Sequence, residues 1–268
     1  MTAFQTTLEK SQALKDQIPD DAQPDQPTGR QALAQWLALP ELWLDVAYLR
    51  SQLVVTATPD EAAVPFDILR TRLVCLARQH GWRRIAMVSP AGGAGKTTTA
   101  VNLAFALGRQ SGLRTLALDF DLRKPTMGRV LGARVPLNMT DLMQGQGHLS
   151  SVLRRHGQGM AFGLNDGSVG QSSEWLQSVE AVDLTARFEA TYAPDLMLID
   201  LPNLAQADDA IGFLPNVDAA LIVVEAGRHS SYDIDVIERQ VAEQTRVAGI
   251  VLNKCTLPDS PFGPRRTN

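Results

Sequence analysis

The stretch Ser89-Pro90-Ala91-Gly92-Gly93-Ala94-Gly95-Lys96-Thr97-Thr98-Thr99 decides the fold class of this 268-residue chain. It lies between an apolar run at residues 85–89 and a helical pattern of apolar residues at 101–107. A glycine-rich loop between a strand and a helix is typical of phosphate sites, because successive N–H groups point inward at phosphate oxygens. The following helix presents the positive end of its dipole to the same oxygens. The stretch therefore predicts a strand, a phosphate-binding loop and a helix.

Each polar side chain of this loop has an expected role. The Lys96 ammonium would contact the β and γ phosphates, the Thr97 hydroxyl would bind magnesium, and Thr98 would donate toward the α phosphate. The strict pattern G-x-x-x-x-G-K-[ST] is not met, because Pro90 takes the place of the first glycine. What remains is the tighter Gly-Gly-x-Gly-Lys-Thr form. The alternative, an ordinary glycine turn with a solvated lysine, is disfavoured by the strand and helix on either side. The backbone of the loop would contact the phosphates through Gly92, Gly93, Ala94 and Gly95.

Three carboxylates follow apolar runs elsewhere in the chain. Asp119 and Asp121 end the run at residues 115–120, and Asp200, followed by Pro202, ends the run at 196–201. Ligands of open parallel sheets collect at the carboxyl ends of strands, so we expect these aspartates to converge on the phosphates. Three carboxylates beside a triphosphate require a cation, which implies Mg²⁺. For each aspartate alone, a cap or turn role at a strand end is the alternative.

Five apolar runs, at residues 85–89, 115–120, 196–201, 219–224 and 247–253, alternate with longer helical stretches. They are nearly continuous rather than alternating, as strands buried on both faces of a parallel sheet are. We therefore predict an α/β fold with an open, mostly parallel sheet flanked by helices. The segment Gly145–Gly170 is rich in glycine and polar residues, and there we expect a surface loop or a mobile segment.

The rest of the chain divides by composition. Residues 1–30 are charged and proline-containing and predict a disordered arm. Residues 31–60 predict two short amphipathic helices, interrupted by Pro40, and a linker; either they pack onto the main domain or they dock a partner. Residues 61–257 form the expected nucleotide-binding, kinase-like domain, and 258–268 a flexible tail.

Composition excludes several classes of function. The formal net charge is −4, so no general attraction to nucleic acid or to anionic lipid is expected. No stretch approaches the roughly 18 uninterrupted apolar residues of a membrane-spanning helix. We therefore expect a cytoplasmic protein without direct membrane insertion, whose membrane role, if it has one, depends on a partner.

Together, the loop, the D-x-D-x-R segment from Asp119 to Arg123 and the strand ending at Asp200 resemble the bacterial tyrosine kinase family of CpsD/CapB type. That family lies within the MinD/ParA-like ATPases with a deviant P-loop, and the resemblance covers roughly residues 65–256. It implies ATP and Mg²⁺ as cofactors, with Asp121 and Asp200 holding the metal directly or through water. It also implies that Asp119 receives the proton of an attacking hydroxyl, and that Arg123 orients the following loop or neutralises transferred charge. Asn253, at the end of the last apolar run, would read adenine, with a simple turn role as the alternative.

The sequence departs from the family pattern in three places. The lysine that MinD/ParA proteins carry before Gly-Gly-x-Gly-Lys-Thr is Ala91 here, which favours the kinase branch. The E-x-x-R-x-x-R motif of ring assembly falls on Val64, Asp67 and Arg70, of which only Arg70 matches. Residues 259–268 hold none of the tyrosines that the kinases phosphorylate on themselves, so self-phosphorylation in the usual form is not expected.

The resemblance implies a cytoplasmic, ATP-dependent kinase-like protein held at the inner face of the membrane by a partner. That partner would be a membrane chain-length regulator, or polysaccharide co-polymerase, of exopolysaccharide or capsule synthesis and export. A homo-oligomer is compatible with this interpretation. Two alternatives remain: a switch ATPase of MinD/ParA type, and a non-catalytic nucleotide-binding regulator of the polysaccharide complex.

Overall fold

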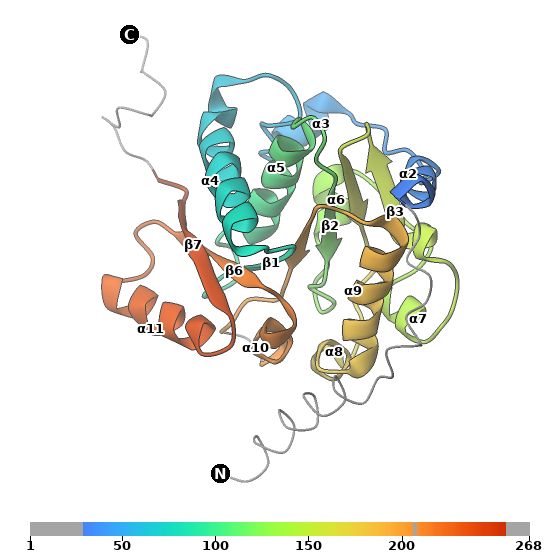
Figure 1. The fold of residues 1–268 in the computed structure, drawn as a ribbon. Coiled ribbons are helices and arrows are strands. Elements are labelled where there is room, and N and C mark those ends of the chain that lie inside the picture. Colours follow the sequence, from blue (N-terminus) through green and yellow to red (C-terminus); the bar gives the residue numbers. More distant parts are fainter. Residues whose placement is uncertain (1–28, 206–207, 256–268) are drawn as a thin grey trace.

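A computed structural model describes residues 29–205 and 208–255. Its centre is a seven-stranded sheet with the order β3-β4-β2-β5-β1-β6-β7 (Figure 1). Only the β3/β4 pair is antiparallel among these strands. The predicted α/β fold with an open, mostly parallel sheet is confirmed. The strands are β1 Arg84–Val88, β2 Thr115–Asp119, β3 Leu153–His156, β4 Met160–Gly163, β5 Leu196–Asp200, β6 Ala219–Glu225 and β7 Arg246–Asn253.

Helices cover both faces of the sheet, α4 and α5 on one and α9 and α10 on the other (Figure 1). Side chains of β1 alternate between the two layers: Ile85 and Met87 pack in the core beneath α4 and α5, while Ala86 and Val88 pack in the core beneath α9. The helical elements are α2 Gly29–Leu37, α3 Val46–Ser51, η2 Glu61–Ala63, α4 Val64–His80, α5 Lys96–Gly108, α6 Met127–Leu131, α7 Met139–Met143, η3 Leu149–Val152, α8 Ser172–Leu176, α9 Val179–Tyr192, α10 Asp209–Phe213, η4 Leu214–Asn216 and α11 Ser231–Ala242.

The strand order brings the predicted functional segments to one edge of the sheet. β5 lies between β1 and β2, with Asp200 in register with Met87 on one side and with Asp119 on the other. The loop after β1 and the acidic ends of β2 and β5 are therefore neighbours, although they lie far apart in sequence. This is the edge at which open α/β sheets bind ligands.

The expectation of a surface loop or mobile segment at residues 145–170 is wrong. The segment contains η3 and the antiparallel pair β3/β4, and Ala161 and Phe162 of β4 are fully buried. β3 is an edge strand and carries polar side chains, so its sequence lacks an apolar run. Glycine is more common in loops, but Gly163 lies in β4, where a Cβ would lie 2.5 Å from the Leu118 side chain.

The two predicted helices in the N-terminal segment form as α2 and α3, and the segment packs onto the domain. Trp36 of α2 is fully buried and donates its indole N–H to the Gln158 carbonyl at 2.8 Å. The Asn102 side chain of α5 accepts the N–H groups of Val55 and Thr56, which fixes the linker. Of the two alternatives for this segment, packing is what the structure shows. The predicted arm lies outside the described residues, apart from Gly29 and Arg30, which begin α2. The predicted tail also lies outside them, and the domain is described only as far as residue 255.

Replacing Trp36 by alanine is expected to destabilise the protein by about 3–5 kcal/mol, because the cavity left by a fully buried indole cannot collapse. Trp43→Ala is the matched control: its side chain is 84% exposed on the same segment, so its cost should be within about 0.5 kcal/mol. Urea unfolding of both variants measures the difference. Equal stabilities would contradict the packing of α2 into the core.

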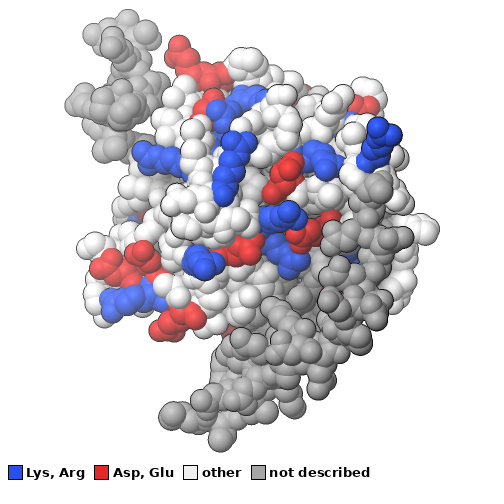
Figure 2. Space-filling model, in the orientation of Figure 1, with Lys and Arg blue, Asp and Glu red and all other residues white. Residues whose placement is uncertain are grey.

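The surface carries both signs of charge. Basic and acidic side chains are interspersed on the face drawn in Figure 2, in keeping with the small net charge of −4. None of the helices within residues 29–205 and 208–255 combines the length and the apolar character that crossing a bilayer requires.

Candidate functional site

Residues 89–95 form a tight loop from the end of β1 to the start of α5. Gly93 and Gly95 adopt φ values of +86° and +85°, which side-chain-bearing residues rarely adopt. In the described part of the chain, no side chain caps the first turn of the 13-residue helix α5, whose N-terminal N–H groups face this loop. A helix N-terminus with free N–H groups favours an anion. The predicted order of strand, loop and helix is therefore present.

Asp200 binds the first two side chains of α5, Lys96 and Thr97. Its carboxylate accepts from Lys96 Nζ at 2.5 Å and from Thr97 Oγ1 at 2.6 Å. The ion pair is buried: Lys96 is 7% exposed and Asp200 is fully buried. The groups expected to bind phosphate and magnesium are therefore both paired with Asp200.

Asp119 lies at the adjacent strand end and is fully buried. Its carboxylate accepts the N–H groups of Met127 at 2.9 Å and Asp121 at 3.3 Å. Burial, reinforced by the negative charge of Asp200, raises its pKa well above the ordinary value of an aspartate. Burial also raises the pKa of Asp121. A carboxylate with a raised pKa is a better proton acceptor than an ordinary aspartate.

Arg123, predicted as a catalytic residue, contacts a group of polar residues around Asp209 rather than the loop. Its guanidinium pairs at 3.2 Å with Asp209, a fully buried residue of α10 that also accepts from the hydroxyls of Ser172 and Ser173. Burial alone would raise the pKa of Asp209, but the hydrogen bonds from the two serines and Arg123 outweigh burial and lower it. Sequence reasoning missed Asp209, for which the only local signal is a pair of acidic residues opening a short apolar helix.

Asn253, at the end of β7, reaches the loop. Its amide Nδ2 donates to the Ala94 carbonyl at 2.8 Å. A Cβ on Gly95 would lie 2.3 Å from the same Nδ2. The predicted role of Asn253 in reading adenine stays a prediction, and its observed contact is with the loop itself.

Gly95→Ala is expected to weaken nucleotide binding at least about tenfold, because the added Cβ collides with Asn253 and disfavours φ +85°. Gly112→Ala is the matched control, since Gly112 has φ +77° but nothing within 4 Å of the added Cβ. It carries the same type of backbone strain without the collision. Titration calorimetry with Mg-ADP compares the two, and equal affinities would show that the contact with Asn253 has no bearing on binding.

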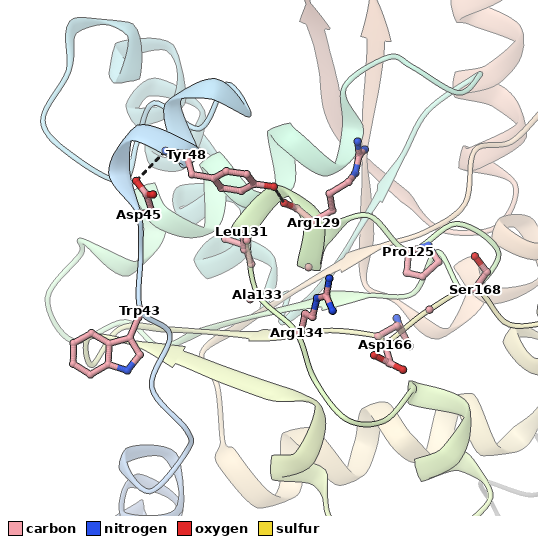
Figure 3. A pocket seen from close by; sticks show the side chains of 14 residues that line it. Trp43, Asp45, Tyr48, Pro125, Arg129, Leu131, Ala133, Arg134, Asp166 and Ser168 are labelled. Atoms are coloured by element: carbon pink, nitrogen blue, oxygen red, sulfur yellow. Dashed lines mark hydrogen bonds between the residues drawn. The ribbon is translucent and has the colours of Figure 1, made fainter.

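A separate hollow of about 790 Å³ lies beside α6, lined by residues of three segments, 43–48, 125–134 and 165–168 (Figure 3). Tyr48 closes one side by donating its hydroxyl to the Arg129 carbonyl at 2.6 Å. No residue of the 89–99 stretch lines it. It adjoins the site described above: the amide of Asn165 donates to the Asp119 carbonyl at 2.7 Å, and the lining segment 125–134 includes Met127, whose N–H donates to the Asp119 carboxylate. The hollow is thus distinct from the phosphate-binding loop.

Residues 85–261 match the CobQ/CobB/MinD/ParA nucleotide binding domain family, a match that spans the loop and all three aspartates. The chain belongs to this family. Within it, the chain groups with the bacterial tyrosine kinases of CpsD type: it is 29% identical over 182 residues to the tyrosine-protein kinase CpsD of Streptococcus pneumoniae. That match covers 67% of this chain and 79% of CpsD.

Other similar proteins are longer than this chain or more distant from it in sequence. The chain is 31% identical over 177 residues to the succinoglycan biosynthesis transport protein ExoP of Rhizobium meliloti, covering 64% of this chain but only 22% of ExoP. Its fold matches the crystal structure of the chimerical protein CapA2B2 with a TM-score of 0.67 at 22% identity, over 85% of this chain and 99% of that one. Two proteins of similar fold, the cobyrinic acid a,c-diamide synthase of Mycobacterium smegmatis and the septum site-determining protein MinD of Pyrococcus horikoshii, have been solved with ADP and magnesium.

Proposed function

We propose that this member of the family binds Mg-ATP at the edge formed by β1, β2 and β5 and transfers its γ-phosphoryl group. The proposal rests on one observation, the convergence of groups that follow three different strands. Lys96 and Thr97, just after β1, hydrogen-bond to Asp200 at the end of β5. Asp200 is in register with Asp119 at the end of β2. Phosphoryl transfer requires mainly positioning and charge neutralisation, and each of these groups supplies one of the two. Lys96 would exchange Asp200 for phosphate oxygens when nucleotide enters.

The residues fit a magnesium ion held partly by the nucleotide. No group of three Asp, Glu, His or Cys residues able to hold a metal occurs in residues 29–205 and 208–255, so the three aspartates do not form an all-protein cage. Mg²⁺ rarely uses such cages; it is typically held by one or two protein oxygens, phosphates and water. Thr97 and Asp200, with Asp121 nearby, are that kind of donor set. The ion supplies neutralisation of phosphate charge when bound.

Asp119 is the residue that we propose as proton acceptor. Its raised pKa suits the removal of a proton from an attacking hydroxyl, and the Met127 and Asp121 N–H groups hold the carboxylate in place. We propose that Arg123, anchored by Asp209, orients the loop that follows β2 rather than contacting the nucleotide. Asp121, whose pKa is also raised by burial, would hold the metal directly or through water.

The biological setting is proposed from the relatives. CpsD is a tyrosine-protein kinase and ExoP a transport protein of succinoglycan biosynthesis, so we propose a role in exopolysaccharide or capsule production. The chain would work in the cytoplasm at the inner membrane face, recruited by a membrane chain-length regulator, with self-association as part of the assembly. Ala91 in place of the lysine of MinD/ParA proteins favours this function over that of a switch ATPase.

The test is to incubate the purified protein with Mg-ATP, with and without the cytoplasmic segment of the chain-length regulator, and to measure ADP release and phosphotyrosine together. Phosphotyrosine on the regulator that disappears with Lys96→Ala would establish a kinase acting in trans. ADP release without phosphotyrosine would contradict the kinase and favour a switch ATPase. Bound ATP with neither product would make the chain a non-catalytic regulator.

A further inference from the structure

Two side chains outside the phosphate-binding loop donate hydrogen bonds to carbonyl groups of the loop. Arg228, in the turn after β6, donates from Nη1 to the Gly92 carbonyl at 2.9 Å. Asn253, at the end of β7, donates to the Ala94 carbonyl at 2.8 Å. The guanidinium also lies beside Gly93, since its Nη1 would be 3.6 Å from a Cβ on that glycine.

These contacts fix alternate peptide planes of the loop. In a trans peptide the carbonyl of one residue and the N–H of the next point in opposite directions. The Gly92 carbonyl points at Arg228 and the Ala94 carbonyl points at Asn253, so the Gly93 and Gly95 N–H groups point away from these two side chains. Glycine backbone is otherwise free to rotate, so these planes are the part of the loop that most needs an external constraint.

Arg228 is itself held in place by Glu225, the last residue of β6. Glu225 Oε2 accepts from Arg228 Nη1 at 3.0 Å, and Oε1 accepts from Lys254 Nζ at 3.0 Å. Lys254 directly follows Asn253 and adopts φ +57°, an unfavourable conformation for a lysine that the ion pair helps to retain. Glu225 thus connects the residue that holds Gly92 to the strand end that holds Ala94. Its single negative charge is shared between Arg228 and Lys254, so the three side chains together keep one net positive charge.

We propose that Arg228, fixed by Glu225, is a positioning residue of the nucleotide site: it holds the Gly92–Gly93 peptide plane so that the Gly93 N–H faces the polyphosphate. This inference rests on the proposed nucleotide binding. It assigns a function to the end of β6, which the sequence motifs do not include. Because the Gly93 N–H would serve ADP and ATP alike, loss of Arg228 should affect both nucleotides equally.

The test compares Arg228→Met, which keeps length but removes the donors, with Arg228→Lys and with the control Arg239→Met on α11. Arg239 is exposed and its side chain bonds only to the Asp235 carbonyl of its own helix among the described residues. For Arg228→Met we expect the Kd for both Mg-ADP and Mg-ATP to rise about tenfold, the loss expected for a hydrogen bond from a charged group. Arg228→Lys should recover part of this loss, and Arg239→Met should bind like the wild type. kcat at saturating ATP should change by less than about threefold, since the reacting groups are untouched.

A second measurement needs no nucleotide. Amide hydrogen exchange of the peptide spanning residues 90–96 should be faster in Arg228→Met than in the wild type, while the rest of the sheet exchanges at the same rate. Unchanged affinity and unchanged exchange would overturn the inference. Weakened ATP binding with normal ADP binding would also overturn it, because Arg228 would then contact the γ-phosphate directly. A wild-type protein that binds no nucleotide would instead refute the proposed function on which the inference rests.

Discussion

Lys96→Ala is expected to abolish detectable Mg-ATP binding and to destabilise the nucleotide-free protein by about 3–5 kcal/mol, the cost of leaving one partner of a buried ion pair alone. The partner is Asp200, fully buried and 2.5 Å from Lys96 Nζ. Thr97 would remain as a hydrogen-bond donor to Asp200, but it carries no charge. A lysine that served only the nucleotide would leave the stability of the empty protein unchanged, so the two effects together distinguish this site.

The double variant Lys96→Ala/Asp200→Asn separates the two consequences. Removing the unpaired charge should restore much of the lost stability, while nucleotide binding stays absent. Lys124→Ala, an exposed lysine in the turn after β2, controls for the loss of a lysine as such. Urea unfolding and calorimetric titration with Mg-ATP are the measurements. A single Lys96→Ala variant as stable as the wild type would contradict the buried pair.

Asp119→Asn is expected to lower turnover about 10²–10⁴-fold, the usual contribution of a general base, while Mg-ATP still binds. The amide oxygen can still accept the Met127 N–H, so the strand end should keep its conformation. Initial rates of ADP release and the Kd for Mg-ATP report the two properties. Turnover equal to that of the wild type would show that Asp119 does not accept the proton.

The same substitution should change stability in a direction set by the raised pKa. Burial raises the pKa of Asp119 in the folded state, so the folded protein binds this proton more tightly than the unfolded chain does. The free energy of unfolding therefore falls as the pH rises from the pKa of Asp119 in the unfolded chain to its pKa in the folded protein. Above the folded-state pKa, the buried negative charge destabilises the folded protein. Asp119→Asn removes this cost, so the nucleotide-free variant should become more stable relative to the wild type as the pH rises above the ordinary pKa of an aspartate, about 4. Unfolding curves at a series of pH values above about 4 check the sign, and a difference independent of pH would contradict it.

The parts of the fold that were predicted are those in which local sequence is sufficient. β1, β2, β5 and β6 are buried on both faces and carry continuous apolar runs. β3 was missed because an edge strand faces water and tolerates residues such as Arg154 and Arg155. β7 was predicted, but not as an edge strand, and Leu252 is exposed there where burial on both faces was expected.

The candidate site divides in the same way. Lys96 and Thr97 follow from a contiguous motif, and Asp119 and Asp200 from the rule that parallel strands end at one edge. The pair of Arg123 with Asp209 joins residues 86 positions apart, and the contact of Arg228 with Gly92 joins residues 136 apart. Both contacts depend on the order of the strands in the sheet. The apolar run that predicts a strand does not indicate which strands lie beside it. The order of strands is thus the information that single-sequence patterns lack.

A crystal structure of the protein with Mg-ADP tests the account most directly. We predict that the diphosphate lies against the N–H groups of residues 93–97, that Lys96 Nζ leaves Asp200 for a phosphate oxygen, and that the metal lies beside Thr97. Nucleotide bound instead in the hollow lined by Trp43 and Tyr48, or phosphates bound elsewhere with the Lys96–Asp200 pair intact, would contradict the account.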